Sequence, residues 1–260
     1  MDLAARLTWL TRIGFAARGL LYIVIAVLIA YAGRAEDPAG ALQYLGQRSG
    51  SVMMVLIAAG LIAYGIWRLS DAAFNIERHE SDAKGKAERV GAALSGAVHL
   101  LLAWQAIRLV QGVRSAGDGT EQGARMALEL PGGPALVVIG GALFAGLGLY
   151  QLVKAAKGGF LDHLEPQIAR QAWARWSGRL GYAARGVVFI LSGWFLARAG
   201  WESDAGEAGG MAQALAWLDR PMDLIVAAGL LGFGLFSLIE ARFRILRDVP
   251  VDRAVRRLKR

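Results

Sequence analysis

Four charged side chains stand inside, or at the edge of, long apolar stretches: Arg18, Asp71, Arg185 and Glu240. A charge in the hydrocarbon of a bilayer is costly, so such residues pair with each other, reach the headgroups or mark a pathway for ions. Two kinds of chemistry remain open. The charges clasp neighbouring helices together, or the two arginines line a cavity open to the cytoplasm and attract a small anion.

Three further polar residues, Ser95, His99 and Gln105, lie in the third apolar stretch. Ser95 and His99 are four residues apart and share one face of a helix, which could face an axis between helices. A lone histidine among apolar residues usually bonds to a neighbouring helix. The chain has no cysteine, and we expect His79 and His163 in loops far from His99, so we predict no metal, haem or other cofactor.

The sequence also lacks the patterns that carry common catalytic chemistry. No Gly-x-Ser-x-Gly or His-Glu-x-x-His occurs, and no two carboxylates share an apolar stretch. We therefore predict that the protein is not an enzyme.

The composition indicates a membrane protein. Of the 260 residues, 55% are hydrophobic and 19% are charged, and the mean hydropathy is +0.40. These values exclude a soluble α/β enzyme, a disordered chain and a coiled coil. Six stretches approach the ~20 apolar residues that span a bilayer, and lipid forces each to be helical. They are residues 14–32, 52–69, 90–110, 134–153, 180–199 and 221–239. The predicted fold is all-α, a polytopic membrane protein with six transmembrane helices.

The distribution of charge predicts the orientation in the membrane. Most of the 29 Lys and Arg residues lie on the side that holds the N-terminus, the second and fourth loops and the C-terminus. Because basic residues are retained in the cytoplasm, we expect both termini there, with the protein in a bacterial inner membrane. The net charge of +8 is therefore a topology signal, and we predict no nucleic-acid partner.

The tail after Arg242 is rich in arginine and includes Arg244 and Arg247. We expect this tail to bind anionic lipid headgroups. Other membrane proteins or a second copy of the chain are further candidate partners.

One helix pair occurs three times along the chain. Residues 9–19 read Trp-Leu-Thr-Arg-Ile-Gly-Phe-Ala-Ala-Arg-Gly, and residues 176–186 read Trp-Ser-Gly-Arg-Leu-Gly-Tyr-Ala-Ala-Arg-Gly. A weaker copy at 89–96 has Ser95 where the others have arginine. We predict three repeats within one membrane domain, at residues 1–85, 86–170 and 171–260.

A short amphipathic element separates the two long helices of each repeat, at residues 41–45, 127–130 and 214–218. These elements are too short to span a bilayer, so we expect them along the outer surface. Two spans per repeat make the repeats parallel, which predicts a pseudo-three-fold ring of six helices around an axis along the membrane normal.

The triplicated helix pair, with its Gly-aromatic-Ala-Ala-Arg-Gly opening, resembles a bacterial inner-membrane family of unknown function over about residues 9–245. The resemblance implies the repeat fold and brings no established activity with it.

Antiparallel neighbours place the start of each odd helix level with the end of the even helix in the same repeat. A Coulomb pair would then explain why the basic and the acidic residue are both lost from the second repeat. The predicted pairs are Arg18 with Asp71, Ser95 with Lys154, and Arg185 with Glu240.

Two functions are compatible with these observations. We favour a non-enzymatic structural or accessory membrane component that binds lipid or other membrane proteins. The alternative is a carrier or conduit for a small anion, with Arg18, Ser95, His99 and Arg185 lining the axis.

Overall fold

The computed structural model describes residues 3–33, 35–77, 79–113 and 119–245. In these ranges the chain is helical, and the only strand-like feature is an isolated bridge between Leu164 and Arg244. Six helices are long and apolar enough to cross a membrane, which confirms the predicted all-α membrane fold. They are α1 (Leu3–Ala32), α3 (Gly50–Phe74), α4 (Ala83–Val110), α6 (Gly133–Lys157), α8 (Ala172–Glu202) and α10 (Met222–Phe243).

A short helix occurs at each predicted amphipathic element. The helix α2 (Pro38–Arg48) contains the first element, whereas α5 (Gly119–Leu128) and α9 (Met211–Ala216) end inside the second and the third. Asp37 caps α2 by accepting a hydrogen bond from the Gly40 amide, and Pro38 fits the first turn because it has no amide hydrogen to satisfy. These short helices do not lie only on the surface. Leu42 of α2 and Leu215 of α9 are buried, so these two helices also close one end of the core.

Shorter elements complete the described chain between the long helices. They are the 3-10 turns η1 (Leu161–His163) and η2 (Ala205–Glu207) and the single helical turn α7 (Pro166–Ala169).

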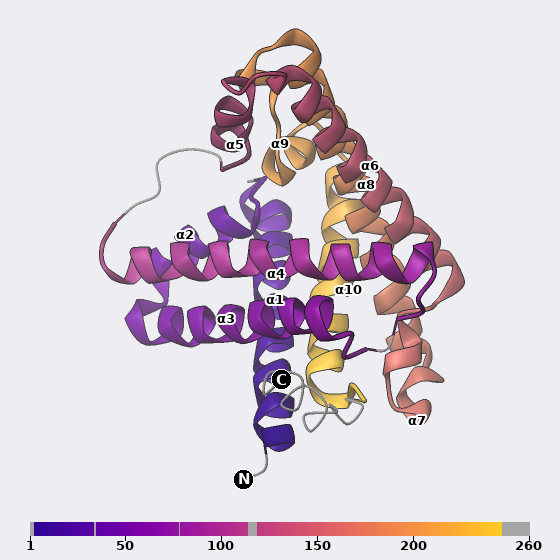
Figure 1. Ribbon diagram of the computed structural model, residues 1–260. Helices are drawn as coiled ribbons and strands as arrows, with labels where there is room; N and C mark the ends of the chain where they lie inside the picture. The colour runs from indigo at the N-terminus through magenta and orange to yellow at the C-terminus, as the bar shows by residue number, and fades with distance from the viewer. Residues whose placement is uncertain (1–2, 34, 78, 114–118, 246–260) are drawn as a thin grey trace, which may run out of the picture.

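The most extensive helix packing joins one repeat to the next. α3 lies along α4, α6 along α8, and α10 along α1, so the third repeat also packs against the first (Figure 1). Each pair crosses where two glycines meet, and a Cβ atom on one glycine would approach a backbone oxygen of the other within 2.9 Å or less. Glycine permits this close approach of helix backbones. The facing glycines are Gly65 with Gly96, Gly148 with Gly186, and Gly19 with Gly234.

The two long helices of one repeat contact each other less extensively than helices of adjacent repeats do, and this contact differs between repeats. In the first repeat α1 crosses α3 where Gly60 faces Ala17, and in the third α8 crosses α10 where Gly229 faces Ala184. In the second repeat, Leu94 stands two positions before its crossing glycine, as the alanines do in the other repeats. Leu143 stands five positions before its own crossing glycine, as Gly60 and Gly229 do.

These two leucines are 52% and 64% exposed, and α4 and α6 pack against each other hardly at all. Two large side chains cannot occupy a crossing made for glycine and alanine. The second repeat is therefore open where the other two are closed, and the regular ring stays a prediction.

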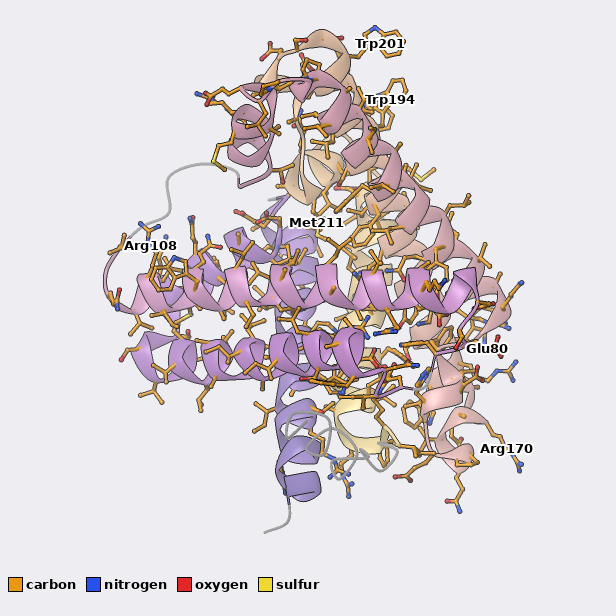
Figure 2. All side chains as sticks on the ribbon, viewed as in Figure 1. Glu80, Arg108, Arg170, Trp194, Trp201 and Met211 are labelled. Atoms are coloured by element: carbon orange, nitrogen blue, oxygen red, sulfur yellow. The ribbon has the colours of Figure 1, made fainter. Side chains whose placement is uncertain are left out.

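Apolar side chains fill the region where the repeats meet. Ile25, Leu61, Leu230, Phe233 and Phe236 have no exposed surface. They belong to one continuous cluster that also takes in residues of α2, α4, α8 and α9. The outer surface is apolar as well, and Trp194 and Trp201 project outward from α8 (Figure 2).

Candidate functional site

Arg18 of α1 lies at the centre of a buried polar cluster. Its guanidinium donates from Nε to Ser237 Oγ at 3.1 Å, from Nη1 to Tyr64 Oη at 2.6 Å, and from Nη2 to Glu240 Oε2 at 2.5 Å. The Phe233 ring lies 4.9 Å from its central carbon, a favourable cation–π contact. All three nitrogens thus have partners, as a buried arginine requires.

The predicted pair between Arg18 and Asp71 is wrong. Arg18 bonds to Glu240 of α10 because α1 packs most closely on α10, where Gly19 meets Gly234. The prediction takes the helix in the same repeat as the closest antiparallel neighbour. The structure closes the first repeat onto the third instead.

Arg244 extends the cluster from Glu240 to Glu77. Its two terminal nitrogens donate to Glu240 Oε1 and to Glu77 Oε1, and its side chain is only 8% exposed. The Arg244 guanidinium and nearby His163 lower the pKa of Glu77 to about 2, although burial alone would raise it. The two carboxylates in turn raise the pKa of Arg244.

Arg244 was expected in the lipid-binding tail, and that expectation is wrong. The Glu165 amide donates to Phe243 O, and the Ile245 amide donates to His163 O, so the chain after α10 is held against the loop that follows α6. This backbone pairing turns the Arg244 side chain inward. The rest of the tail, from residue 246 on, lies outside the described residues.

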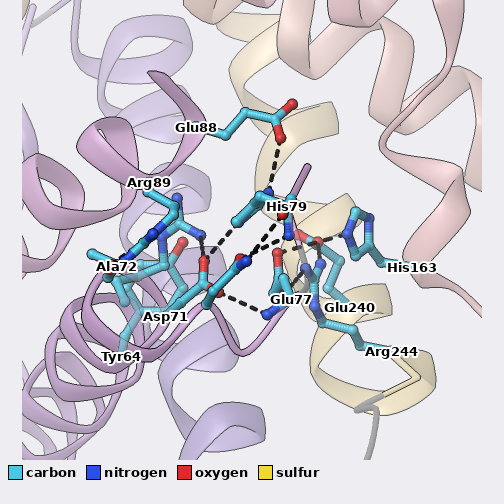
Figure 3. Close-up of polar contacts among 12 residues, drawn as sticks. Tyr64, Asp71, Ala72, Glu77, His79, Glu88, Arg89, His163, Glu240 and Arg244 are labelled. Atoms are coloured by element: carbon cyan, nitrogen blue, oxygen red, sulfur yellow. Dashed lines mark hydrogen bonds and ion pairs between the residues drawn. The ribbon is translucent and has the colours of Figure 1, made fainter. Parts of the chain in front are cut away.

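Asp71 is fully buried and faces the loop after α3 (Figure 3). It accepts a hydrogen bond from the Glu77 amide at 2.8 Å, and Arg68 lies 3.5 Å away. His79 Nε2 is 3.0 Å from Asp71 Oδ2, and His79 Nδ1 is 2.8 Å from Glu88 Oε2. Both ring nitrogens of His79 thus face carboxylates, and the ring connects the end of α3 to the start of α4.

Asp71, Glu77 and His79 each offer an atom within 4.8 Å of the others, a spacing that could hold a divalent cation. Arg68 already neutralises Asp71, and Arg244 already neutralises Glu77. A cation would have to displace these arginines or lie beside them. The contacts are therefore satisfied without a metal.

Arg89 joins the start of α4 to the end of α3. It donates from Nε and Nη2 to Ala72 O, at 2.9 and 2.6 Å, and from Nη2 to Ala73 O at 3.2 Å (Figure 3). A cation suits this position because the last carbonyls of a helix have no amide partner and carry partial negative charge.

Arg185 does not pair with Glu240, so this predicted pair is also wrong. Its guanidinium lies over Phe233 at 4.3 Å and over Phe189 at 4.9 Å. Glu240 is held by Arg18 and Arg244, as described above. On α6, the helix that packs most closely on α8, the residue that corresponds to Glu240 is Lys154, another cation.

Ser95 is likewise not the partner of Lys154, because α3 and not α6 is the close neighbour of α4. His99 Nδ1 donates to Ser95 O, one turn back on its own helix, at 2.7 Å. Its ring packs on Tyr64 of α3 with centroids 4.4 Å apart. Gln105 lies farther along α4, partly buried and away from the cluster.

Sequence reasoning missed the residues that loops bring to the cluster. Glu77 and His79 follow α3, and His163 follows α6; His163 Nε2 lies 3.6 Å from Glu77 Oε2. Both histidines lie between the long helices, as predicted, but that prediction did not place them beside Asp71 and Glu77. These residues could have been found from the sequence, because several titratable residues directly follow two helices that end in charged side chains.

Comparisons with known proteins agree with the repeat structure. An uncharacterized protein of Bacillus subtilis (strain 168), YxxB, is 30% identical over 246 residues, which is 90% of each chain. No solved structure matches this chain. One family of unknown function matches three times, at residues 13–75, 90–158 and 180–244. The chain therefore belongs to the family described as Domain of Unknown Function (DUF1206).

Proposed function

We propose that this protein is a non-enzymatic accessory component of the bacterial inner membrane, which binds lipid or other membrane proteins through its open second repeat. One observation carries the proposal: α4 and α6 do not close on each other, whereas the helix pairs of the first and third repeats do.

The exposed surface of the second repeat supports this role. Only 17% of the apolar window of α6 and 22% of that of α4 is buried, against 61% for α1. In a bilayer such surface is in contact with lipid or with another protein. The outward apolar residues include Val98, Leu101, Ile139 and Leu143.

The buried cluster supports a structural role rather than a catalytic one. Glu77 and Glu240 accept hydrogen bonds from arginines, and Asp71 accepts one from a backbone amide. Groups bonded in this way fix helix ends and loops relative to one another.

The anion conduit remains a second candidate because Arg185 and Lys154 form no ion pair or hydrogen bond with any described residue. The packing of the core favours the accessory role. Phe233 and Phe236 fill the space between helices with no exposed surface, where a conduit needs a wettable path.

Flux measurements separate the two candidates. The purified protein is reconstituted in liposomes, and the uptake of chloride, phosphate and small carboxylates is compared with that of empty liposomes. We expect no difference for the wild type or for Arg185→Gln. Uptake that exceeds the empty-liposome rate and falls in Arg185→Gln would establish the conduit instead.

The orientation is part of this proposal. The excess of basic residues at both termini and in the second and fourth loops supports cytoplasmic ends. Reporters that are active only in the cytoplasm or only outside it, fused after Arg260, test this. Activity of the external reporter would overturn the orientation.

A further inference from the structure

Arg185 of α8 and Lys154 of α6 both lie on helices that pack together where the second and third repeats join. Between the third and first repeats, Arg18 bonds to Glu240 across the α1–α10 crossing. At the same distances from the facing glycines, the α8–α6 crossing carries Arg185 and Lys154. The acid of one crossing is thus replaced by a base in the other.

Neither cation forms an ion pair within 4 Å with a residue that the structure describes, although Glu240 attracts Lys154 from a longer distance. Arg185 forms no hydrogen bond or ion pair with any described residue, and its Nε is buried without an acceptor. Lys154 also lacks both kinds of contact in the described chain, and its Nζ lies 5.0 Å from the Tyr182 ring centre. Aromatic faces stabilise cations only in part. Two cations in a membrane segment without an acceptor leave hydrogen bonds unmade.

Lys154 lies at a suitable depth for a lipid phosphate. Lys154 is one turn before the end of α6 at Lys157, about 4.5 Å along the helix. The end of a spanning helix is where the hydrocarbon gives way to headgroups. An anion at Lys154 would therefore lie at the boundary and not at the centre of the bilayer.

The same region adjoins the open second repeat. Tyr150 is one turn before Lys154 on the same face of α6, and its hydroxyl donates to Glu88 of α4 at 3.2 Å. Beyond this contact α4 and α6 diverge (Figure 1). A Cβ built on Gly91 of α4 or on Gly146 of α6 would meet nothing within 4 Å.

We propose that Arg185 and Lys154 bind the phosphate of one anionic phospholipid, and that its acyl chains lie between α4 and α6. This inference rests on the proposed function and names one ligand for the open repeat. Arginine forms paired hydrogen bonds with phosphate oxygens, and lysine adds a second positive charge. The exposed side chains of Leu94, Val98 and Leu143 provide the apolar contact for the chains.

Lipid titrations followed by native mass spectrometry test the proposal. The full-length protein in detergent is titrated with palmitoyl-oleoyl phosphatidylglycerol, with the corresponding phosphatidylcholine, and with inorganic phosphate. We expect one phosphatidylglycerol to bind in preference to phosphatidylcholine. Loss of a charge-assisted hydrogen bond in Arg185→Gln or Lys154→Gln should weaken this binding about tenfold. Lys157→Gln, an exposed cation one turn further along α6, is the matched control and should bind as the wild type does.

A second variant tests the opening without touching the charges. Leu94→Ala with Leu143→Gly restores the small residues that the other two repeats have at this crossing. We expect α4 and α6 to close and the lipid to be excluded. Both leucines are exposed, so this variant should fold even if Arg185→Gln does not.

Equal binding of phosphatidylglycerol by the wild type and by folded Lys154→Gln would overturn the proposal. Displacement of the lipid by millimolar inorganic phosphate would also overturn it, since the site would then take a free anion. Neither result bears on whether the protein transports anions, so this inference and the proposed function can fail separately.

Discussion

Arg18 and Glu240 are 222 residues apart in the sequence and bond across the α1–α10 interface at 2.5 Å. This contact joins the first repeat to the third. Replacing Arg18 removes its three buried hydrogen bonds and leaves Glu240 with Arg244 as its remaining cation. Breaking a buried ion pair typically costs about 3–5 kcal/mol.

We therefore expect Arg18→Gln to lower the free energy of unfolding in detergent by about 3 kcal/mol. Arg198→Gln is the control, because Arg198 pairs with Glu202 on the exposed surface of α8. That change should cost less than about 1 kcal/mol. Similar losses in the two variants would show that Arg18 is not the clasp described above.

The glycine crossings predict a sharp contrast between two neighbouring positions on α6. A Cβ at Gly148 would lie 2.7 Å from Gly186 O, whereas one at Gly146 would meet nothing within 4 Å. Gly148→Ala should push α6 away from α8 and destabilise the protein by about 1–3 kcal/mol. Gly146→Ala should be neutral or slightly stabilising because alanine favours a helix. Thermal unfolding followed by circular dichroism measures both, and equal effects would contradict the close packing.

The charge cluster predicts a loss of stability in acid. The pKa of Glu77 is about 2 in the fold against 4.5 when free, so its contribution of roughly 3 kcal/mol is complete above pH 4.5. It is lost progressively as the pH falls from 4.5 toward 2. The pKa of His163 is also lowered, by burial and by Arg244. Protonation of His163 should therefore weaken the fold at a higher pH, once the pH falls below about 6.5.

Unfolding as a function of pH checks both statements. Glu77→Gln should be less stable than the wild type at pH 7 and should lose little further stability between pH 4.5 and 2. Glu165→Gln, an exposed acid nearby, should keep the wild-type profile. A wild-type profile in Glu77→Gln would mean that another acid carries the dependence.

The sequence was sufficient to predict the six spans, the short helices between them and the three copies of the helix pair. Length, hydropathy and repetition determine these features, whichever helices become neighbours. The partner of Arg18 could not be predicted in the same way, because Asp71 and Glu240 each lie near the end of an even-numbered span, at the same level. Choosing between them requires knowing that Gly19 meets Gly234, and glycine spacing alone fits either arrangement.

The loop residues of the cluster were harder still. His79 and His163 are 84 positions apart. His79 reaches Asp71 within its own loop, whereas His163 approaches Glu77 because the loop after α6 pairs with the end of α10. The opening of the second repeat did leave a trace in the sequence. Leu94 and Leu143 stand where the other repeats have alanine and glycine. This difference indicates an open repeat only when the positions at which the helices cross are known.

The open second repeat is the central claim, and disulfide trapping tests it most directly because the chain has no cysteine of its own. A Cβ on Gly232 would lie 3.7 Å from Leu180 Cβ across the third repeat, within the ~3.5–4.5 Å that a disulfide requires. Val90 and Gly146 occupy the same positions in the second repeat. Oxidation in native membranes should cross-link Leu180→Cys with Gly232→Cys and leave Val90→Cys with Gly146→Cys unlinked. Equal cross-linking of the two pairs would contradict the account.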